Sequence, residues 1–229
     1  MKYLFILITP LLLISCQGNS TNGKSSPIDS TAIEAPADKK PLSVGEISIY
    51  QSTYNLSEDP NAENEVLKGL NFGIPESQYN RNEKKYLSQY EDDEVYGYHI
   101  GDFGFYNLTP YFNNNELYRV DINGFNKLDY NELLNEINVV KSIFSSKYGS
   151  PIYESNPPKD RELPSNEGIC IAEWKAGKKV IQLCFFDFTK AAHSNLLKVV
   201  IFRSDKLQAL QDQEKQKKEA YSNANTEMI

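Results

Sequence analysis

The chain has 229 residues and a formal net charge of -7, with 40% hydrophobic and 12% aromatic residues. This hydrophobic content is sufficient for the core of one ordinary domain or two small ones. The acidic balance argues against nucleic acids and anionic lipid headgroups as partners.

The N-terminus carries a short apolar run after a basic residue. Lys2 precedes the run Tyr3–Ile14, which is about a dozen residues long, whereas a helix that crosses a bilayer needs about 20. The run has the length of a signal-peptide core. We therefore predict that residues 1–15 are a secretion signal that is removed from the mature protein.

A cysteine follows this run directly. The four residues at the junction are Leu13, Ile14, Ser15 and Cys16, and they resemble the lipobox of bacterial lipoproteins. The resemblance implies that the Cys16 sulfur receives a diacylglyceryl group, that the signal is cut before Cys16, and that the new amine is acylated. Two or three such chains hold a protein on a membrane almost permanently, since each buried methylene contributes about 0.8 kcal/mol. The alternative is a secreted protein with a chance cysteine near its cleavage site.

The residue after the cysteine bears on the destination. Gln17 stands there instead of Asp, and in this family that favours the outer membrane. The segment from Gln17 to Lys40 has almost no large apolar residue, so it cannot bury enough surface to offset the entropy lost on ordering. We predict a lipidated cysteine and flexible tether over residues 16–40, an α+β domain over 41–203, and a C-terminal helix with a frayed tail over 204–229.

The first half of the domain mixes short strands with one helix. Apolar residues predict a short strand over Gly45–Ser52, and a polar loop is expected over Ser57–Glu65. A helix is predicted over residues 76–90, after Pro75. Alternating apolar residues over Tyr96–Phe125 predict antiparallel strands, with a turn at Asn113-Asn114-Asn115 and one polar, solvated face that carries Arg119, Asp121 and Asn123.

The second half begins with the strongest helical pattern in the chain. Asp129 is expected to cap a helix that ends at Gly149, and its buried face is predicted to carry Leu133, Ile137, Val140, Phe144 and Tyr148. A surface loop is predicted over Tyr153–Gly168. Three strands should follow, over Ile169–Trp174, Val180–Phe188 and Leu196–Phe202, and a last helix should begin at Ser204 or Asp205.

This order of elements predicts an α+β fold, in which helices pack on one face of an antiparallel sheet. The predicted elements can also be grouped into two successive units, each a helix followed by a hairpin. Such a grouping would be a degenerate internal repeat.

Two cysteines are expected in the strands that meet across the turn at Ala176-Gly177. One register of this hairpin places Cys170 and Cys184 directly opposite each other, and other registers place them diagonally. The compartment predicted above permits disulfides, so the two cysteines could form a cross-strand bridge or remain two buried free thiols. In both cases we expect a structural role and not a catalytic one. The spacing excludes a redox motif of the C-x-x-C type.

One segment partly matches a calcium-binding loop. Asp121, Asn123 and Glu132 fall at ligand positions of the EF-hand template, but Phe125 occupies a further ligand position and Asn126 occupies that of the invariant glycine. We favour a strand, a turn and a capped helix here. The acidic run Glu91–Glu94 could attract a cation, although such a run is more typical of a solvated loop.

The sequence contains no recognisable catalytic motif. His99 and His193 are the only histidines, and neither has a second ligand near it in the sequence. We therefore expect no cofactor and no metal.

Aromatic residues gather in the predicted strands of the first half: Tyr96, Tyr98, Phe103, Phe105, Tyr106, Tyr111 and Phe112. They could form a platform that stacks sugars or binds peptides, but such residues more often fill the core of a sheet. We favour the core.

Two short motifs flank the predicted helices. Gly73-Ile74-Pro75 and Tyr148-Gly149-Ser150-Pro151 faintly resemble motifs of the accessory lipoproteins of the outer-membrane barrel-assembly machinery. The resemblance implies a small α+β adaptor that binds proteins and performs no chemistry.

These observations support two hypotheses on function. The first is a lipid-anchored envelope protein whose domain is a non-catalytic binding or scaffolding module, with the membrane as one partner through Cys16 and an envelope protein or glycan as another. The alternative is a hydrolase of envelope polymers, with Asp92, Asp93 and Asp121 supplying the acid and the base.

Overall fold

The computed structural model describes residues 42–89, 96–101, 103–105, 107–127, 130–157, 168–187 and 195–226. These ranges all belong to one compact unit that begins at Lys40. The predicted signal peptide, Cys16 and the predicted tether lie outside the described residues.

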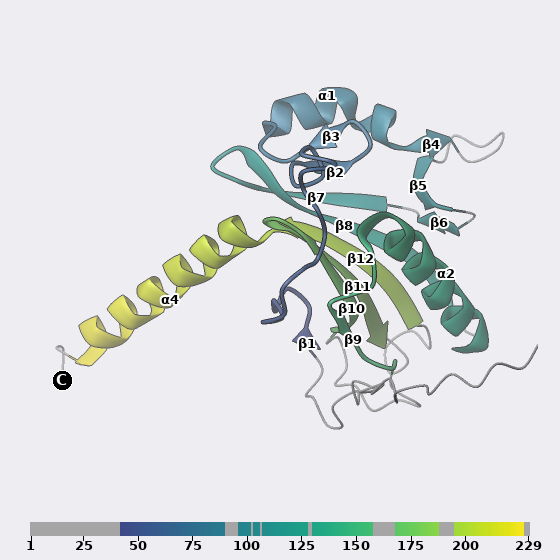
Figure 1. Ribbon diagram of the computed structural model, residues 1–229. Helices are drawn as coiled ribbons and strands as arrows, with labels where there is room; N and C mark the ends of the chain where they lie inside the picture. Colours follow the sequence, from purple (N-terminus) through teal and green to yellow (C-terminus); the bar gives the residue numbers. More distant parts are fainter. Residues whose placement is uncertain are drawn as a thin grey trace, which may run out of the picture. The chain divides into compact units, whose positions relative to one another are not determined.

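The described part of this unit consists of short and long strands with three helices (Figure 1). The helices are α1 (Glu76–Tyr86), α2 (Tyr130–Tyr148) and α4 (Ser204–Thr226). The strands are β1 (Leu42–Ser43), β2 (Glu65–Leu67), β3 (Leu70–Asn71), β4 (Ser88–Gln89), β5 (Tyr96–Ile100), β6 (Phe103–Phe105), β7 (Asn107–Asn113), β8 (Glu116–Lys127), β9 (Tyr153–Glu154), β10 (Gly168–Ala176), β11 (Lys179–Asp187) and β12 (Asn195–Arg203).

Seven of these strands form the main sheet. Its order is β1-β10-β11-β12-β8-β7, with β9 also paired to β10, and every pair is antiparallel. β2 and β3 form a separate ribbon, and β4, β5 and β6 form a small second sheet. The fold is therefore α+β with a large antiparallel sheet, as the order of predicted elements indicated.

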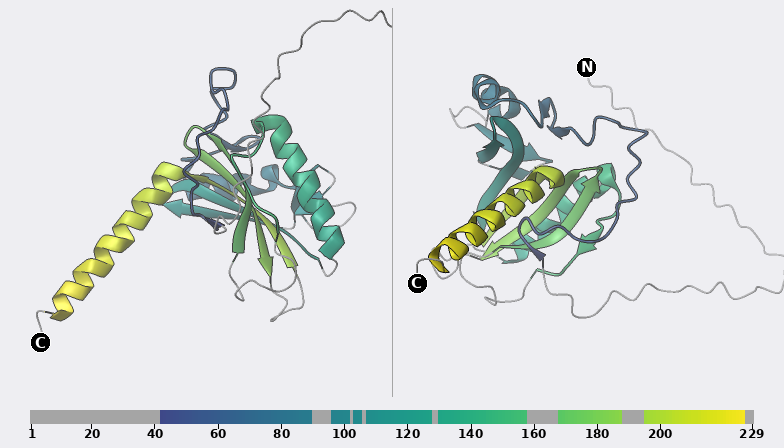
Figure 2. Two further views of the ribbon diagram at one scale, coloured as in Figure 1. Left: turned by 60° about the horizontal axis from the view of Figure 1, so that its bottom comes forward. Right: turned by 90° about the vertical axis from the view of Figure 1, so that its left-hand side faces the viewer.

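Alternation along the strands gives the main sheet two different faces. On one face, Ile181 and Val199 belong to the larger hydrophobic cluster, which also contains Leu133, Ile137 and Val140 of α2. On the other face, a smaller cluster is formed by Tyr153, Cys170, Val180, Cys184, Val200 and Phe202. Figure 2 shows α2 lying beside the strands of the sheet. The predicted buried face of this helix is confirmed, with Phe144 only half buried.

Trp174 fixes the C-terminal end of α2 to the sheet. Its ring centroid lies 5.4 Å from that of Phe144, and its indole N–H donates a hydrogen bond of 3.1 Å to the carbonyl oxygen of Gly149. Gly149 ends the helix as predicted, with φ at +79°, a conformation that glycine adopts without steric cost.

We expect Trp174→Phe to lower the free energy of unfolding by about 1–2 kcal/mol, because the aromatic ring is kept while the Gly149 carbonyl loses its donor. Urea denaturation followed by circular dichroism measures the change, since the substitution removes the only tryptophan of the chain. A loss below about 0.3 kcal/mol would contradict a role for this hydrogen bond.

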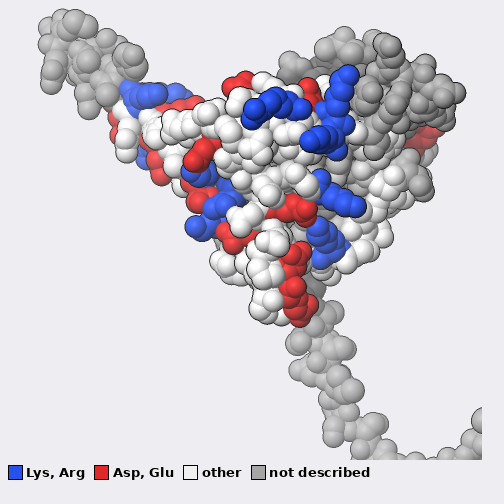
Figure 3. Space-filling view, turned by 90° about the horizontal axis from the view of Figure 1, so that it is seen from above, with Lys and Arg blue, Asp and Glu red and all other residues white. Residues whose placement is uncertain are grey.

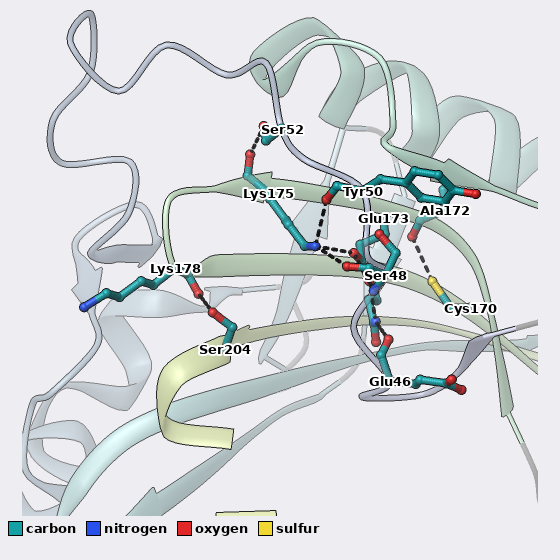
Figure 4. Close-up of polar contacts among 11 residues, drawn as sticks. Glu46, Ser48, Tyr50, Ser52, Cys170, Ala172, Glu173, Lys175, Lys178 and Ser204 are labelled. Carbon is teal, nitrogen blue, oxygen red and sulfur yellow. Dashed lines mark hydrogen bonds and ion pairs between the residues drawn. The ribbon is translucent and has the colours of Figure 1, made fainter. Parts of the chain in front are cut away.

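The strand predicted over Gly45–Ser52 is wrong. β1 covers only Leu42–Ser43, and the next residues bond to side chains of the sheet instead of to a neighbouring strand (Figure 4). The Gly45 amide donates to Oε1 of Gln182 at 2.8 Å, and the Ser48 amide donates to Oε1 of Glu173 at 3.2 Å. We call residues 45–52 the clasp, because they cross the face of the sheet opposite α2 and contact its smaller hydrophobic cluster through Ile47 and Tyr50.

The remaining elements differ from the predictions mainly at their ends. α1 ends at Tyr86, because Ser88–Gln89 pairs with β5 as a strand and the helix cannot continue to residue 90. The turn between β7 and β8 lies at Asn114 and Asn115 as predicted, and both have positive φ, which asparagine tolerates better than most residues. β9 forms within the predicted loop over Tyr153–Gly168.

α4 leaves the sheet and is charged on all sides. Leu207 packs against the smaller cluster, whereas every side chain from Gln211 to Glu219 is exposed. Lysines and acidic residues are mixed along this helix, which extends to the upper left in Figure 3. None of the described helices is long and apolar enough to cross a bilayer.

Deletion of residues 212–229 is expected to change the free energy of unfolding by less than about 0.5 kcal/mol, since the side chains from Asp212 to Glu219 are all exposed. Leu207→Ala is the control, and its loss should exceed about 1 kcal/mol because this residue contacts the core. The stabilities of the truncated protein and of Leu207→Ala are compared by thermal unfolding. A large loss on truncation would show that the helix packs on the domain along its length.

Candidate functional site

A largely apolar cavity lies between α2, β2 and β5, above the main sheet. Its volume is about 350 Å³, which falls in the range of small-ligand sites. The apolar lining includes Leu67, Ile100, Ile143, Phe144, Ile181 and Ile201. We call this cavity the α2 pocket.

Five separate parts of the chain build the α2 pocket, namely β2, β5, α2, β11 and β12. β11 and β12 supply its floor through Ile181 and Ile201, and α2 supplies one wall through Ile143. Gly101, at the end of β5, has φ at +60°, and a Cβ atom there would lie 2.6 Å from Cδ1 of Ile143. Glycine at this position therefore permits the close approach of β5 to α2.

A buried lysine lies beside the pocket. Lys179 is 1% exposed, and its Nζ donates hydrogen bonds to the Tyr148 hydroxyl at 2.9 Å and to the main-chain oxygen of Glu65. Burial, and then the nearby charge of Lys147, lower the pKa of Lys179 to about 7. Burial also raises the pKa of Tyr148. Because Lys179 is enclosed, it can fix Tyr148 in the wall but cannot meet a ligand directly.

The polar groups of the pocket are placed at its rim. Nζ of Lys147 lies 3.7 Å from Oε2 of Glu65, and Lys68 and His99 also line the cavity. An apolar interior with a mixed-charge rim suits a ligand that inserts an apolar group and keeps polar groups outside. The carboxylate of Glu65 is engaged by Lys147 and by the Gly69 amide, so the arrangement suits binding better than proton transfer.

The structure describes one of the two histidines and none of the acidic run. His99 lies on β5 and lines the α2 pocket with Tyr98. His193, the run Glu91–Glu94 and, within it, Asp92 and Asp93 lie outside the described residues. Within the part of the chain that the structure describes, no three His, Cys, Asp or Glu residues are grouped to hold a metal.

Asp121 lies on the other face of the sheet and is bound by cations. It is 1% exposed, so the expectation of a solvated carboxylate there is wrong. Arg119 donates to its two oxygens at 2.6 and 2.8 Å. The calcium-loop alternative does not fit, because residues 121–127 are extended within β8, and α2 starts at Tyr130.

Cys170 and Cys184 are directly opposite each other in the register of β10 and β11. Both are buried free thiols, and the Cys170 thiol donates to the Ala172 carbonyl oxygen at 3.3 Å. The contact with Cys184, and then burial, raise the pKa of Cys170. Opposition satisfies one requirement of a cross-strand disulfide. The bridge itself stays a prediction, and a thiol count on unfolded protein from its host distinguishes the two states.

The predicted aromatic cluster is divided between environments. Tyr98 lines the α2 pocket, Phe112 packs edge-on against Tyr79 with ring centroids 5.9 Å apart, and Tyr111 lies on the opposite face beside Arg119. The side chains of Tyr96, Phe103, Phe105 and Tyr106 lie outside the described residues. The three that are described do not share one platform.

Sequence reasoning missed Lys179, although a pattern pointed to it. Lys179 alternates in phase with Ile181 and Leu183, so it had to share their face of the strand. A charged residue on a core face is costly to bury and marks an unusual site.

Comparison with protein-family models, with curated proteins and with solved structures gives no significant match for this chain.

Proposed function

We propose that this chain is a lipid-anchored protein of the bacterial cell envelope, on the outer membrane, whose α+β domain binds a partner without catalysis. The lipobox-like residues before Cys16 and the polar segment 17–40 support the anchor and its tether. A tethered domain of this kind would serve as an adaptor.

The α2 pocket is the observation that carries the binding function. It is apolar and bordered by Lys68, Lys147 and Glu65, and preformed cavities of this type hold the apolar part of a ligand. A glycan offers few apolar groups. An envelope protein that inserts an apolar side chain is therefore the favoured partner.

An apolar dye tests the pocket. The mature protein should bind the uncharged dye N-phenyl-1-naphthylamine in the pocket, and Ile143→Trp should weaken binding at least tenfold by filling the cavity, a cost of about 1.4 kcal/mol. Asn138→Trp is the matched control, because Asn138 lies on the same helix and is exposed. Equal affinity in Ile143→Trp and the control would refute the pocket as the binding site.

Cys16→Ser tests the anchor separately. In the bacterial host, the substituted protein is expected to move from the membrane fraction to the soluble fraction. Serine has no sulfur atom to form the thioether that carries the diacylglyceryl group. Mass spectrometry of the unsubstituted protein should show the added lipid. Unchanged fractionation of the Cys16→Ser protein would contradict lipid anchoring and leave the pocket result unaffected.

A further inference from the structure

A second concavity lies on the face of the main sheet that α2 does not cover. Its volume is about 500 Å³, and β7, β8 and β12 line it through Tyr111, Arg119, Asp121 and Lys198. Val44 and Phe186 border it as well. We call it the Asp121 groove. It does not overlap the α2 pocket, so the inference below does not rest on the proposed function.

Two cations share one carboxylate in this groove. Besides the two hydrogen bonds from Arg119, Oδ2 of Asp121 lies 3.3 Å from Nζ of Lys198. The three side chains together carry one net positive charge. Arg119 alone satisfies both oxygens of the carboxylate, so the charge of Lys198 exceeds what Asp121 requires.

The cations are held in place but still reach solvent. The Arg119 guanidinium carbon lies 4.9 Å from the ring centroid of Tyr111, and Nζ of Lys198 lies 4.8 Å from that of Phe186. The side chains of Arg119 and Lys198 are each 19% exposed. Among the described residues, Nη1 of Arg119 makes no hydrogen bond, so donors stay available on this side.

A glycine keeps the aromatic wall in position. A Cβ atom on Gly168 would lie 2.4 Å from Cε1 of Phe186, so the ring can lie against β10 only because position 168 has no side chain. The groove thus joins a fixed aromatic surface to a surplus cation. In a chain with a net charge of -7, this local positive charge would select for an anion.

We propose that the Asp121 groove binds a small organic carboxylate that carries a planar apolar group. The single surplus positive charge matches a monoanion, whereas a phosphate dianion would leave a negative charge in a partly desolvated groove. The carboxylate would accept from Lys198 and Nη1 of Arg119, and the planar group would lie along the ring of Tyr111, which is 36% exposed.

Benzoate is the probe, and benzamide is its uncharged counterpart of similar shape. Titrations of the mature protein, followed by proton–nitrogen correlation spectra, should show benzoate binding at least tenfold more tightly than benzamide. Lys198→Met should weaken benzoate at least tenfold, while Lys198→Arg should retain binding within about threefold because it keeps the charge. Lys178→Met, at an exposed lysine outside the groove, should leave binding unchanged.

Three results would overturn the assignment. They are equal affinity for benzoate and benzamide, unaltered benzoate binding in Lys198→Met, and tighter binding of inorganic phosphate than of benzoate. Lys198→Met leaves the hydrogen bonds between Arg119 and Asp121 intact, so the fold should survive. If Lys198→Met nevertheless unfolds, the Lys198→Arg protein and the comparison of benzoate with benzamide still test whether the groove binds a carboxylate.

Discussion

Lys179→Met is expected to stabilise the domain at pH 6 by about 1–4 kcal/mol, because it replaces a buried cation by an apolar side chain of similar length. The domain holds Lys179 with a pKa lowered from 10.5 to about 7, first by burial and then by the charge of Lys147. Glu65 and Asp59 act in the opposite direction, but they do not outweigh burial. The charged form of this lysine therefore opposes folding.

The same shift predicts how the stability of the unsubstituted protein depends on pH. Between about pH 7 and pH 10.5, the unfolded chain holds a proton on Lys179 that the folded chain has released. The free energy of unfolding contributed by this site therefore rises with pH across that interval. Below pH 7 both states are protonated, and the full cost of burying the charge applies. With about 1.4 kcal/mol for each pKa unit, the rise is at most several kcal/mol.

Urea denaturation at pH 6, 7, 8 and 9 measures this effect. The difference in stability between Lys179→Met and the unsubstituted protein should shrink as the pH rises, since other titrating groups contribute equally to both. Lys178→Met is the control, because Lys178 is the exposed neighbour, and its difference should stay constant. The Tyr148 hydroxyl loses its donor in Lys179→Met, so the gain is smaller than the full cost of the charge. Parallel pH profiles would contradict the lowered pKa.

The parts of the fold that the sequence predicted are those in which local pattern and packing agree. In α2, Leu133, Ile137 and Val140 recur with helical spacing and are all buried against the sheet. In β10 and β11, alternation and the turn glycine Gly177, with φ at +59°, define the hairpin and its register. These elements need only neighbouring residues to specify them.

The clasp shows why local pattern fails elsewhere. Ile47 and Tyr50 resemble residues of a strand, but Ile49 is 89% exposed, and none of the strands that the structure describes pairs with this segment. Its amides are satisfied by Glu173 and Gln182, more than a hundred positions further along the chain. Such partners leave no trace in the local sequence. The α2 pocket was missed for the same reason, since β2, β5, α2 and the sheet each supply only a few of its residues.

Glu173→Ala is expected to lower the free energy of unfolding by about 3–5 kcal/mol, because it leaves a partly buried cation without its carboxylate. The carboxylate of Glu173 is fully buried. It accepts from the Ser48 amide at 3.2 Å and from Nε2 of Gln182 at 2.8 Å, and it lies 3.5 Å from Nζ of Lys175 (Figure 4). Glu173→Gln keeps an acceptor and loses only the charge, so a smaller loss of about 1–2 kcal/mol is expected.

The stability change should be concentrated at the clasp. Lys175 donates to the carbonyl oxygens of Ser48 and Tyr50, so removal of Glu173 disturbs both sides of the network that binds residues 45–52. Hydrogen exchange under native conditions should therefore show the Ser48 amide losing protection in Glu173→Ala, while amides between β11 and β12 lose less. Glu116→Ala, at an exposed glutamate, should alter neither.

The position of the clasp gives this prediction a functional consequence. The clasp closely follows β1, and β1 pairs with β10 at Leu42 and Ser43, so a pull on the predicted tether would reach this strand pairing first and then the network around Glu173. Opening of both β1 and the clasp would lengthen the predicted tether by the residues released. Limited proteolysis should then cut Glu173→Ala within residues 45–52 faster than the Glu116→Ala control. Equal cleavage rates, together with full protection of the Ser48 amide, would show that apolar packing of Ile47 and Tyr50 holds the segment without this carboxylate.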